Sequence, residues 1–145
     1  MKERQGGFLI SKIKVLGGRR FEKILKEKNI DAFNGAQGKI LYVLWQGGKM
    51  SFTKISKNSG LAKTTLTAML ARMREQGLVC IEENSEDKRS AMVSLTQKAA
   101  ELKEEYNAVT QEIESIYYKG FSDAETEQFE NYLRRILKNL EGENG

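Results

Sequence analysis

The sequence predicts a mainly α-helical protein that contains one small β-hairpin. Most apolar residues recur at the three-to-four-residue spacing of amphipathic helices, between short groups of glycine. Residues 78–95 differ, because two short apolar runs there flank a polar turn, which is typical of a hairpin. The length of 145 residues fits one domain, and we assign residues 1–145 to it.

The first predicted helix covers residues 8–28. Gly17 and Gly18 lie in its middle, where each glycine costs about 1 kcal/mol relative to alanine. We therefore expect a kink or a close contact with another helix at this point. One face of the helix carries Ile10, Ile13, Gly17, Phe21 and Ile24.

A second helix is predicted to begin after Asn34, which can cap it, with Gln37 returning the capping bond. Its inward face would hold Ala36, Ile40, Val43 and Leu44, and Gly47-Gly48 would end it.

Two further helices follow in close succession. Ser51 is placed to cap a short helix that presents Phe52 and Ile55 inward and stops at Gly60. The next helix runs from about residue 63 to 76 and ends before Gly77. Two helices joined by the turn 59–62 form a helix-turn-helix pattern. The buried side of the second one holds Leu66, Leu70 and Met73.

The hairpin comes directly after this pair of helices. Residues 78–81 and 90–95 form its strands, and residues 82–89 form its charged turn. A helix-turn-helix followed by such a hairpin is a winged helix. We place this lobe at residues 34–95, flanked by N- and C-terminal dimerisation helices at residues 8–28 and 96–141.

The C-terminal helices carry apolar stripes that one chain offers little core to cover. One helix is predicted from Thr96 to about Lys119, and Ser122 to Glu125 reads as a capping box for another. A second copy of the chain would cover these stripes economically. The first seam comprises Ala99, Leu102, Tyr106, Val109, Ile113 and Ile116, and the second Phe129, Leu133, Ile136 and Leu140.

The amino-acid composition excludes several common kinds of catalytic and metal site. The chain has no histidine and one cysteine, which removes the common nucleophile pairs and the usual structural zinc sites. We expect no cofactor, no metal and no enzyme activity. The lone cysteine and the lack of an apolar membrane or signal segment favour the cytoplasm. Residues 1–30 hold nine Lys/Arg and three Asp/Glu, whereas residues 99–145 hold five and eleven. This gradient suits a polyanion at the basic end, although it also fits ordinary solvated helices.

Residues 36–96 resemble the MarR family of transcriptional regulators. The resemblance rests on Gln37, on the turn from Ile55 to Gly60, on residues 61–67 (LAKTTLT) and 73–79 (MREQGLV), and on Leu95-Thr96. Its most specific part is the Asp-x-Arg-Ser motif in the hairpin turn, at residues 87–90. The chain departs from the family pattern at Ile81, where a basic residue is frequent, and at Ala99, where glycine is usual.

The expected DNA-binding residues fall in two groups. In the helix at residues 63–76, small polar residues near the N-terminus can reach base edges, and an arginine can reach phosphate or guanine. Local capping is the alternative role for the threonines. In the hairpin, arginine suits a minor groove, lysine a phosphate, and the resemblance implies that aspartate orients the arginine. The residues are Lys63, Thr64, Thr65, Thr67, Ala68 and Arg72, with Asp87, Lys88 and Arg89; Arg74 could equally be a solvated surface residue.

Three further features have both a possible functional role and a structural one. Ser51 and Thr53 lie near a helix N-terminus, where backbone N–H groups could bind phosphate. Cys80 lies in an apolar strand, so we expect a buried and inert thiol. Five aromatic residues could line a small effector pocket between the dimerisation helices and the DNA-binding lobe, although helical spacing favours a core role: Tyr42, Trp45, Tyr106, Tyr117 and Tyr118.

The sequence and the resemblance together predict a homodimeric, sequence-specific regulator of transcription. It would bind a pseudo-palindromic operator in double-stranded DNA, repress transcription and be released by a small-molecule effector. The alternative is a winged-helix module for protein–protein contact without a DNA target. A membrane-surface protein anchored by the first helix ranks lower, because Gly17-Gly18 interrupts its stripe.

Overall fold

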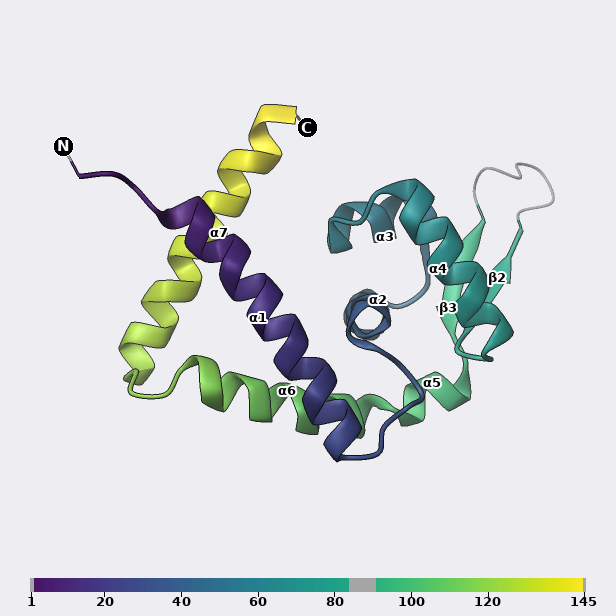
Figure 1. The fold of residues 1–145 in the computed structure, drawn as a ribbon. Helices are drawn as coiled ribbons and strands as arrows, with labels where there is room; N and C mark the ends of the chain where they lie inside the picture. Colours follow the sequence, from purple (N-terminus) through teal and green to yellow (C-terminus); the bar gives the residue numbers. More distant parts are fainter. Residues whose placement is uncertain (1, 84–90, 145) are drawn as a thin grey trace. The chain divides into compact units, whose positions relative to one another are not determined.

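The computed structural model describes residues 2–83 and 91–144, the side chains of residues 143 and 144 excepted, and the chain forms two compact units (Figure 1). The first unit is Met1–Thr110 and the second is Gln111–Gly145. The elements are α1 (Gly6–Glu27), α2 (Gly35–Gly47), β1 (Met50–Ser51), α3 (Phe52–Ser59), α4 (Lys63–Glu75), β2 (Val79–Glu82), β3 (Met92–Leu95), α5 (Gln97–Glu101), α6 (Lys103–Tyr117) and α7 (Asp123–Asn144). The mainly helical class with a small antiparallel sheet is confirmed.

The first helix begins two residues before its predicted start and continues through both central glycines. Gly17 is buried. Because glycine has no side chain, another segment can approach the helix closely at this position. Asn29 ends the helix with φ 58°, and the Ile30 N–H donates to the Leu25 carbonyl at 2.9 Å. This is a Schellman-type cap, in which asparagine replaces the more common glycine.

The predicted cap of α2 is confirmed. The Gln37 backbone N–H donates to Asn34 Oδ1 at 2.8 Å, and the Asn34 backbone N–H donates to Gln37 Oε1 at 3.1 Å. Gln37 is also 5% exposed, whereas Ala36 is exposed, so the inward position predicted for Ala36 is wrong. The reason is that Gln37 turns back over the helix start and takes the buried position.

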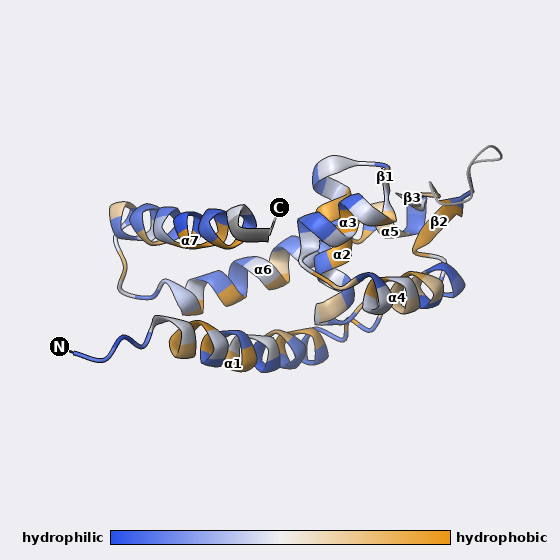
Figure 2. Cartoon of the chain, turned by 90° about the horizontal axis from the view of Figure 1, so that it is seen from above, coloured by the Kyte–Doolittle hydropathy of each residue, from blue (hydrophilic) through white to orange (hydrophobic). Residues whose placement is uncertain are grey.

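Helices α3 and α4 follow the predicted pattern closely. Ser51 caps α3 through a bond from the Lys54 N–H, and Gly60 ends it in the left-handed region at φ 79°. Ile55, Leu66, Leu70 and Met73 are fully buried. Figure 2 shows the apolar residues gathered in α2 and in the strands that lie with these helices in the first unit.

The sheet has three strands in the order β1-β3-β2, all antiparallel. The sequence pattern did not predict a strand before α3, but Met50 pairs with Val93 and adds a third strand. Two residues are too few to show the alternation by which strands are recognised. Side chains alternate along β2, so Val79 is buried and Cys80 is exposed. The expected burial of Cys80 is therefore wrong.

The helix predicted over residues 96–119 forms as two helices, α5 and α6. Thr96 caps α5 by accepting the Ala99 N–H at 3.2 Å. The Leu102 N–H then donates to the Ala99 carbonyl, three residues back, which tightens one turn. The apolar spacing that predicted one continuous helix carries no signal of this change in hydrogen-bond register.

The second unit contains the end of α6 and all of α7. Ser122 and Glu125 form the predicted capping box, with bonds of 3.1 Å and 2.8 Å. Tyr118 stacks edge-on with Phe121 and Phe129 at centroid distances of 5.6 Å and 6.1 Å. These aromatic contacts join α7 to the end of α6.

Candidate nucleic-acid interface

The orientation of α4 is fixed by the apolar residues on its buried side, and this determines which side is exposed. Leu66, Leu70 and Met73 are fully buried, so the helix cannot rotate without exposing them. At about 100° per residue, five exposed residues fall within one sector of roughly 100° on the other side. They are Thr64, Thr65, Ala68, Arg72 and, in the last turn, Glu75. Thr67 is exposed beside this sector, and Lys63 is exposed at the first position of the helix.

The threonine hydroxyls on this surface are not equivalent. Thr67 Oγ1 donates to the Lys63 carbonyl at 2.8 Å, so its proton is committed to the helix backbone. Among the described residues, the hydroxyls of Thr64 and Thr65 make no hydrogen bond. These two remain able to donate to a base edge or a phosphate, whereas Thr67 follows the alternative of local capping.

The turn before α4 is held by short bonds. Ser56 Oγ donates to the Leu61 carbonyl at 2.6 Å, and the Leu61 N–H donates to Ser59 Oγ at 3.2 Å. Ala62 occupies the N-cap and has no side-chain acceptor. The first N–H groups of α4 are consequently uncapped, as suits a helix whose N-terminus meets phosphate.

The C-terminal end of α4 is fixed to the sheet. The Leu78 N–H donates to the Met73 carbonyl, and Gly77 takes φ 77°, which completes a Schellman cap. Thr96 Oγ1 donates to the Gly77 carbonyl at 2.7 Å, and Lys98 Nζ to the Gln76 carbonyl at 3.0 Å. Thr96, which follows β3, and Lys98 on α5 thus hold the C-terminal end of α4 in place.

An ion pair supports the outer edges of the sheet. Lys49 Nζ lies 2.6 Å from Glu82 Oε2, and the hydrogen bond from Lys49, followed by its charge, lowers the pKa of Glu82. Both side chains are well exposed, so the pair contributes little to the free energy of folding.

The predicted hairpin contacts cannot be placed. Asp87, Lys88 and Arg89 lie outside the described residues. The strands that lead to them are described: β2 runs to Glu82 and β3 starts at Met92. Of the weaker phosphate candidates, Ser51 is committed to its cap, since its hydroxyl accepts the Lys54 N–H, while Thr53 is exposed.

The five aromatic residues proposed for an effector pocket divide into separate clusters. Tyr106 lies at the centre of the first, with Trp45 at 5.1 Å and Tyr42 at 6.2 Å between ring centroids. Tyr118 belongs to the second unit, and Tyr117 is exposed. A Cβ on Gly38 would lie 3.2 Å from the Tyr106 ring, so glycine allows α2 to pack on that ring.

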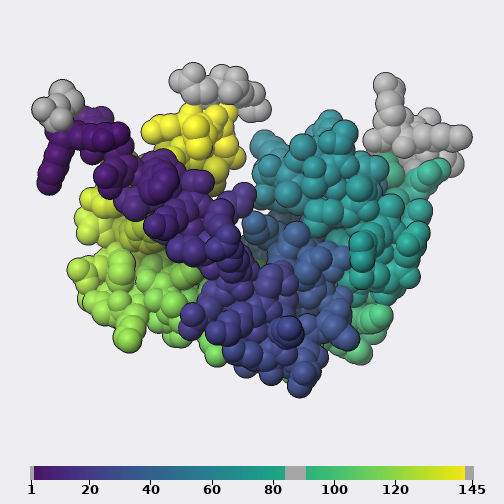
Figure 3. All heavy atoms as spheres, in the orientation of Figure 1, coloured from purple at the N-terminus to yellow at the C-terminus, as the bar shows by residue number. Residues whose placement is uncertain are grey.

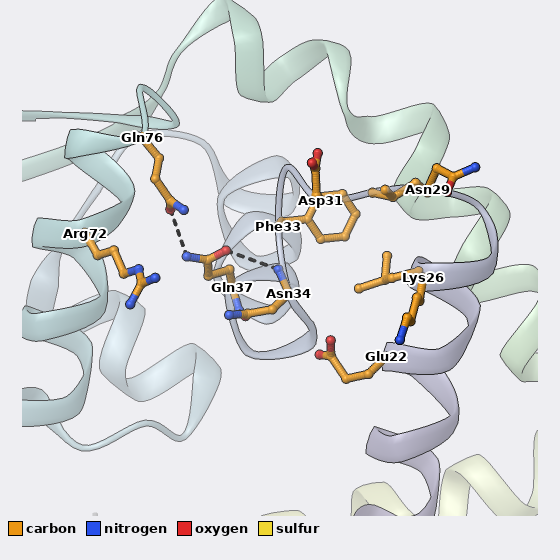
Figure 4. Close-up of a pocket in the computed structure, with 11 residues that line it drawn as sticks. Glu22, Lys26, Asn29, Asp31, Phe33, Asn34, Gln37, Arg72 and Gln76 are labelled. Atoms are coloured by element: carbon orange, nitrogen blue, oxygen red, sulfur yellow. Dashed lines mark hydrogen bonds between the residues drawn. The ribbon is translucent and has the colours of Figure 1, made fainter.

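A cavity of about 620 Å³ opens between the α1–α2 connection and the end of α4 (Figure 4). Gln37 Nε2 donates to Gln76 Oε1 at 2.9 Å across it, which links α2 to α4. Arg72 also lines the cavity, and its side chain extends toward Gln37. The sequence showed Gln37 as a cap, but no local signal revealed its contact with a residue 39 positions away.

Large apolar side chains stand exposed on α1 and α7. Phe8 is 68% exposed and Leu140 66%, and the side chains of α1 form much of the surface in Figure 3. The chain itself buries Val109 and Ile113, two of the predicted dimerisation residues. The others are exposed or half-buried: Ile10, Ile13, Phe21, Ile116, Phe129, Leu133, Ile136 and Leu140.

Two features of the described residues bear on other classes of protein. None of the helices in residues 2–83 and 91–144 combines the length and apolar character needed to cross a bilayer. Across the same residues, no group of three or more acidic or cysteine side chains is arranged to hold a metal ion.

Known proteins resemble this chain in sequence and in fold. The family model described as "MarR family" matches residues 33–91. The HTH-type transcriptional repressor IacR of Pseudomonas putida is 28% identical over 85% of this chain and 72% of its own length. The organic hydroperoxide resistance transcriptional regulator of Bacillus subtilis is 32% identical over 72% of this chain and 69% of its own. A mutant of MarR from E. coli, solved in complex with operator DNA, has a TM-score of 0.78 and 25% identity, covering 90% of this chain and 92% of that one.

Proposed function

Because the chain belongs to the MarR family of DNA-binding transcriptional regulators, we propose that it acts as a homodimeric, sequence-specific repressor. Its relatives are regulators, and the chain is not an enzyme. The observation that carries the proposal is the exposed sector of α4, whose opposite side is fully buried. An α-helix fits the major groove of B-DNA, and small polar side chains on it can reach base edges.

The contacts are assigned as follows. Thr64, Thr65 and Ala68 would meet base edges, and Lys63 and Arg72 would meet phosphate or guanine. Asp87, Lys88 and Arg89 keep their proposed roles in the hairpin, with Arg89 in the minor groove. Two copies would place their α4 helices in successive major grooves, about 34–36 Å apart, on a pseudo-palindromic operator.

The dimer itself is proposed from apolar exposure. Residues 8–28 and 96–141 would form its base, and residues 34–95 would form each DNA-binding lobe. The N-terminal half of α1 exposes apolar side chains over much of its circumference, more than isolated surface residues would explain. The repressor role follows the name of the IacR relative, and we place the protein in the cytoplasm, where its operator would be.

We also propose that a small-molecule effector releases the protein from DNA. A solved structure of similar fold at 21% identity is that of BpsR of Bordetella bronchiseptica, whose DNA binding is regulated by 6-hydroxynicotinic acid. An effector acts by binding one dimer conformation more tightly than the other.

The decisive experiment selects fragments from random duplex DNA with the purified full-length protein. We expect a two-fold symmetric consensus with half-sites about one helical turn apart. Absence of any preferred sequence, with a folded dimer retained, would leave the protein–protein module as the better account.

A matched pair of variants then tests the α4 surface on the selected duplex. Ala68→Glu places a carboxylate in the exposed sector, and we expect at least about a hundredfold weaker binding from phosphate repulsion and steric exclusion. Ala100→Glu makes the same change on α5, where Ala100 is exposed, and should stay within about threefold. Fluorescence anisotropy at one salt concentration measures both; equal losses would contradict the assignment.

A further inference from the structure

The C-terminal end of α4 is held by hydrogen bonds from two other helices, and these bonds meet at Gln76. This residue is the C-cap of α4. Its side-chain oxygen accepts the Gln37 amide N–H from α2 at 2.9 Å (Figure 4), and its backbone carbonyl accepts Lys98 Nζ from α5 at 3.0 Å. One residue therefore receives a donor from each of two helices that lie outside the helix-turn-helix.

The bond from α2 has a fixed direction. The Asn34 backbone N–H can only donate, so the oxygen of Gln37 must face it, at 3.1 Å. The NH₂ group of Gln37 consequently faces Gln76. Gln37 is also buried, and its amide cannot turn over without breaking the cap of α2. Gln37 thus holds a donor toward the end of α4.

The bond from α5 combines charge and packing. A helix carries its negative dipole end at its last carbonyls, where a lysine ammonium is favourable. A Cβ on Gly77 would lie 4.0 Å from Lys98 Cδ, so the stem of the lysine passes close to the residue that follows the cap. Thr96 adds a bond to the Gly77 carbonyl at 2.7 Å. The start of α5 therefore holds the last carbonyls of α4.

The buried stripe of α4 does not by itself fix the tilt of the helix. Leu66, Leu70 and Met73 resist rotation about the helix axis, but apolar contacts are non-directional and allow small tilts. Directional bonds at the C-terminal end oppose such tilts. Arg72 lies one turn before Gln76 on the same side of α4, so a tilt would also move its guanidinium.

We propose that Gln37 and Lys98 are positioning residues for DNA recognition, which act through Gln76 to fix the tilt of α4. The inference rests on the proposed function. In a dimer on a pseudo-palindromic operator, the tilt of each α4 decides which spacing between half-sites both helices can meet. One added base pair moves a half-site by about 3.4 Å and turns it by about 35°. A firmly held α4 rejects that spacing, whereas a loosely held α4 tolerates it.

The ratio of affinities for two duplexes tests this role. One duplex is the selected operator, and the other carries one base pair inserted between its half-sites. We expect wild-type protein to bind the second at least about thirtyfold more weakly, and Gln76→Met, which removes the acceptor for Gln37, to reduce this ratio at least about threefold. Gln97→Met makes the same change at a residue whose amide bonds to Glu101 within α5, and should keep the wild-type ratio.

Gln76→Glu is the rescue variant. It keeps an oxygen at the same reach, so the Gln37 N–H can still bond. Its charge should weaken binding to both duplexes through phosphate repulsion and leave their ratio as in wild type. An equal fall of the ratio in Gln76→Met and Gln76→Glu would show that the hydrogen bond from Gln37 does not set the spacing, and would refute its role.

Lys98→Met tests the second bond. It keeps most of the aliphatic stem beside Gly77 and removes the donor to the Gln76 carbonyl, so the ratio should again fall at least about threefold. Lys103→Met, at an exposed lysine of α6, is the matched control and should not change it. Wild-type ratios in both Gln76→Met and Lys98→Met, with wild-type circular dichroism, would overturn the proposal.

Nuclear magnetic resonance of the ¹⁵N-labelled full-length protein tests the bond from α2 without DNA. The side-chain NH₂ protons of Gln37 should exchange with water at least about tenfold faster in Gln76→Met than in wild type or Gln76→Glu. Equal exchange in all three proteins would refute the bond and the proposal with it. Slow exchange in wild type, together with no DNA binding at all, would refute the proposed function and the spacing role while leaving the bond in place.

Discussion

At the scale of single residues, two half-buried threonines show why a hydroxyl stabilises one position and not another. Thr96 Oγ1 donates to the Gly77 carbonyl at 2.7 Å and accepts the Ala99 N–H at 3.2 Å. Thr110 Oγ1 is buried and has no partner among the described residues. A buried hydroxyl without a hydrogen bond costs free energy, whereas a paired one contributes about 1 kcal/mol.

Valine substitutions at these positions should therefore have opposite effects. Thr96→Val loses a cap and leaves the Gly77 carbonyl unpaired, so we expect a loss of about 1–3 kcal/mol in the free energy of unfolding. Thr110→Val removes only an unsatisfied group and should be neutral or stabilising. Urea unfolding at one protein concentration compares them; similar losses in both would contradict the stabilising role assigned to the hydrogen bonds of Thr96.

At the scale of elements, the contact between α6 and α7 depends on one half-buried phenol. Tyr118 Oη donates to Glu130 Oε2 at 2.7 Å. Burial, then the hydrogen bond and charge of Glu130, raises the pKa of Tyr118 to about 12. Because the folded state holds this proton more tightly than the unfolded state, its contribution is complete below about pH 10 and is lost toward pH 12.

Tyr118→Phe tests this contact through its pH dependence. The variant should be less stable than wild type at pH 7, and the difference should shrink as the pH rises from about 10 to 12. Tyr117→Phe, at an exposed neighbour, is the matched control and should show neither effect. Urea unfolding over this pH range gives the answer, and a difference independent of pH would contradict the assigned hydrogen bond.

At the scale of the whole molecule, the exposed apolar faces imply a second copy of the chain. Ile136, Leu137 and Leu140 are 44%, 56% and 66% exposed on α7. Fully burying such side chains is worth about 1.5–3 kcal/mol each, which favours association. Four of the six acidic residues of the same helix precede this apolar stretch, at positions 123–130.

Charge substitution on α7 tests the dimer. Ile136→Asp places a carboxylate on the apolar stripe, and we expect a weaker dimer with a monomer visible at micromolar concentration in sedimentation velocity. Asn131→Asp adds the same charge about 140° away around the helix and should sediment like wild type. Identical sedimentation of the two variants would show that this face does not form the interface.

The sequence by itself determined the features that depend on neighbouring residues in the chain, namely helix caps, helix ends and amphipathic stripes. The cap at Asn34, the stops at Gly60 and Gly77, the capping box at Ser122 and the buried stripe of α4 all depend on residues within a few positions of one another. Each therefore leaves a pattern that can be recognised without a fold. The exposed sector of α4 follows from the same periodicity, since its position is opposite that stripe.

Only the tertiary structure decided the contacts between distant segments. The strand β1 exists because β3 lies beside it, the exposure of Cys80 depends on the face that β2 presents, and the bond between Gln37 and Gln76 joins residues 39 positions apart. Arg72 looked like a DNA-contact residue in sequence, and the fold also places it in a cavity. Such features depend on which surfaces meet in space, and periodicity along one segment carries no information about its neighbours.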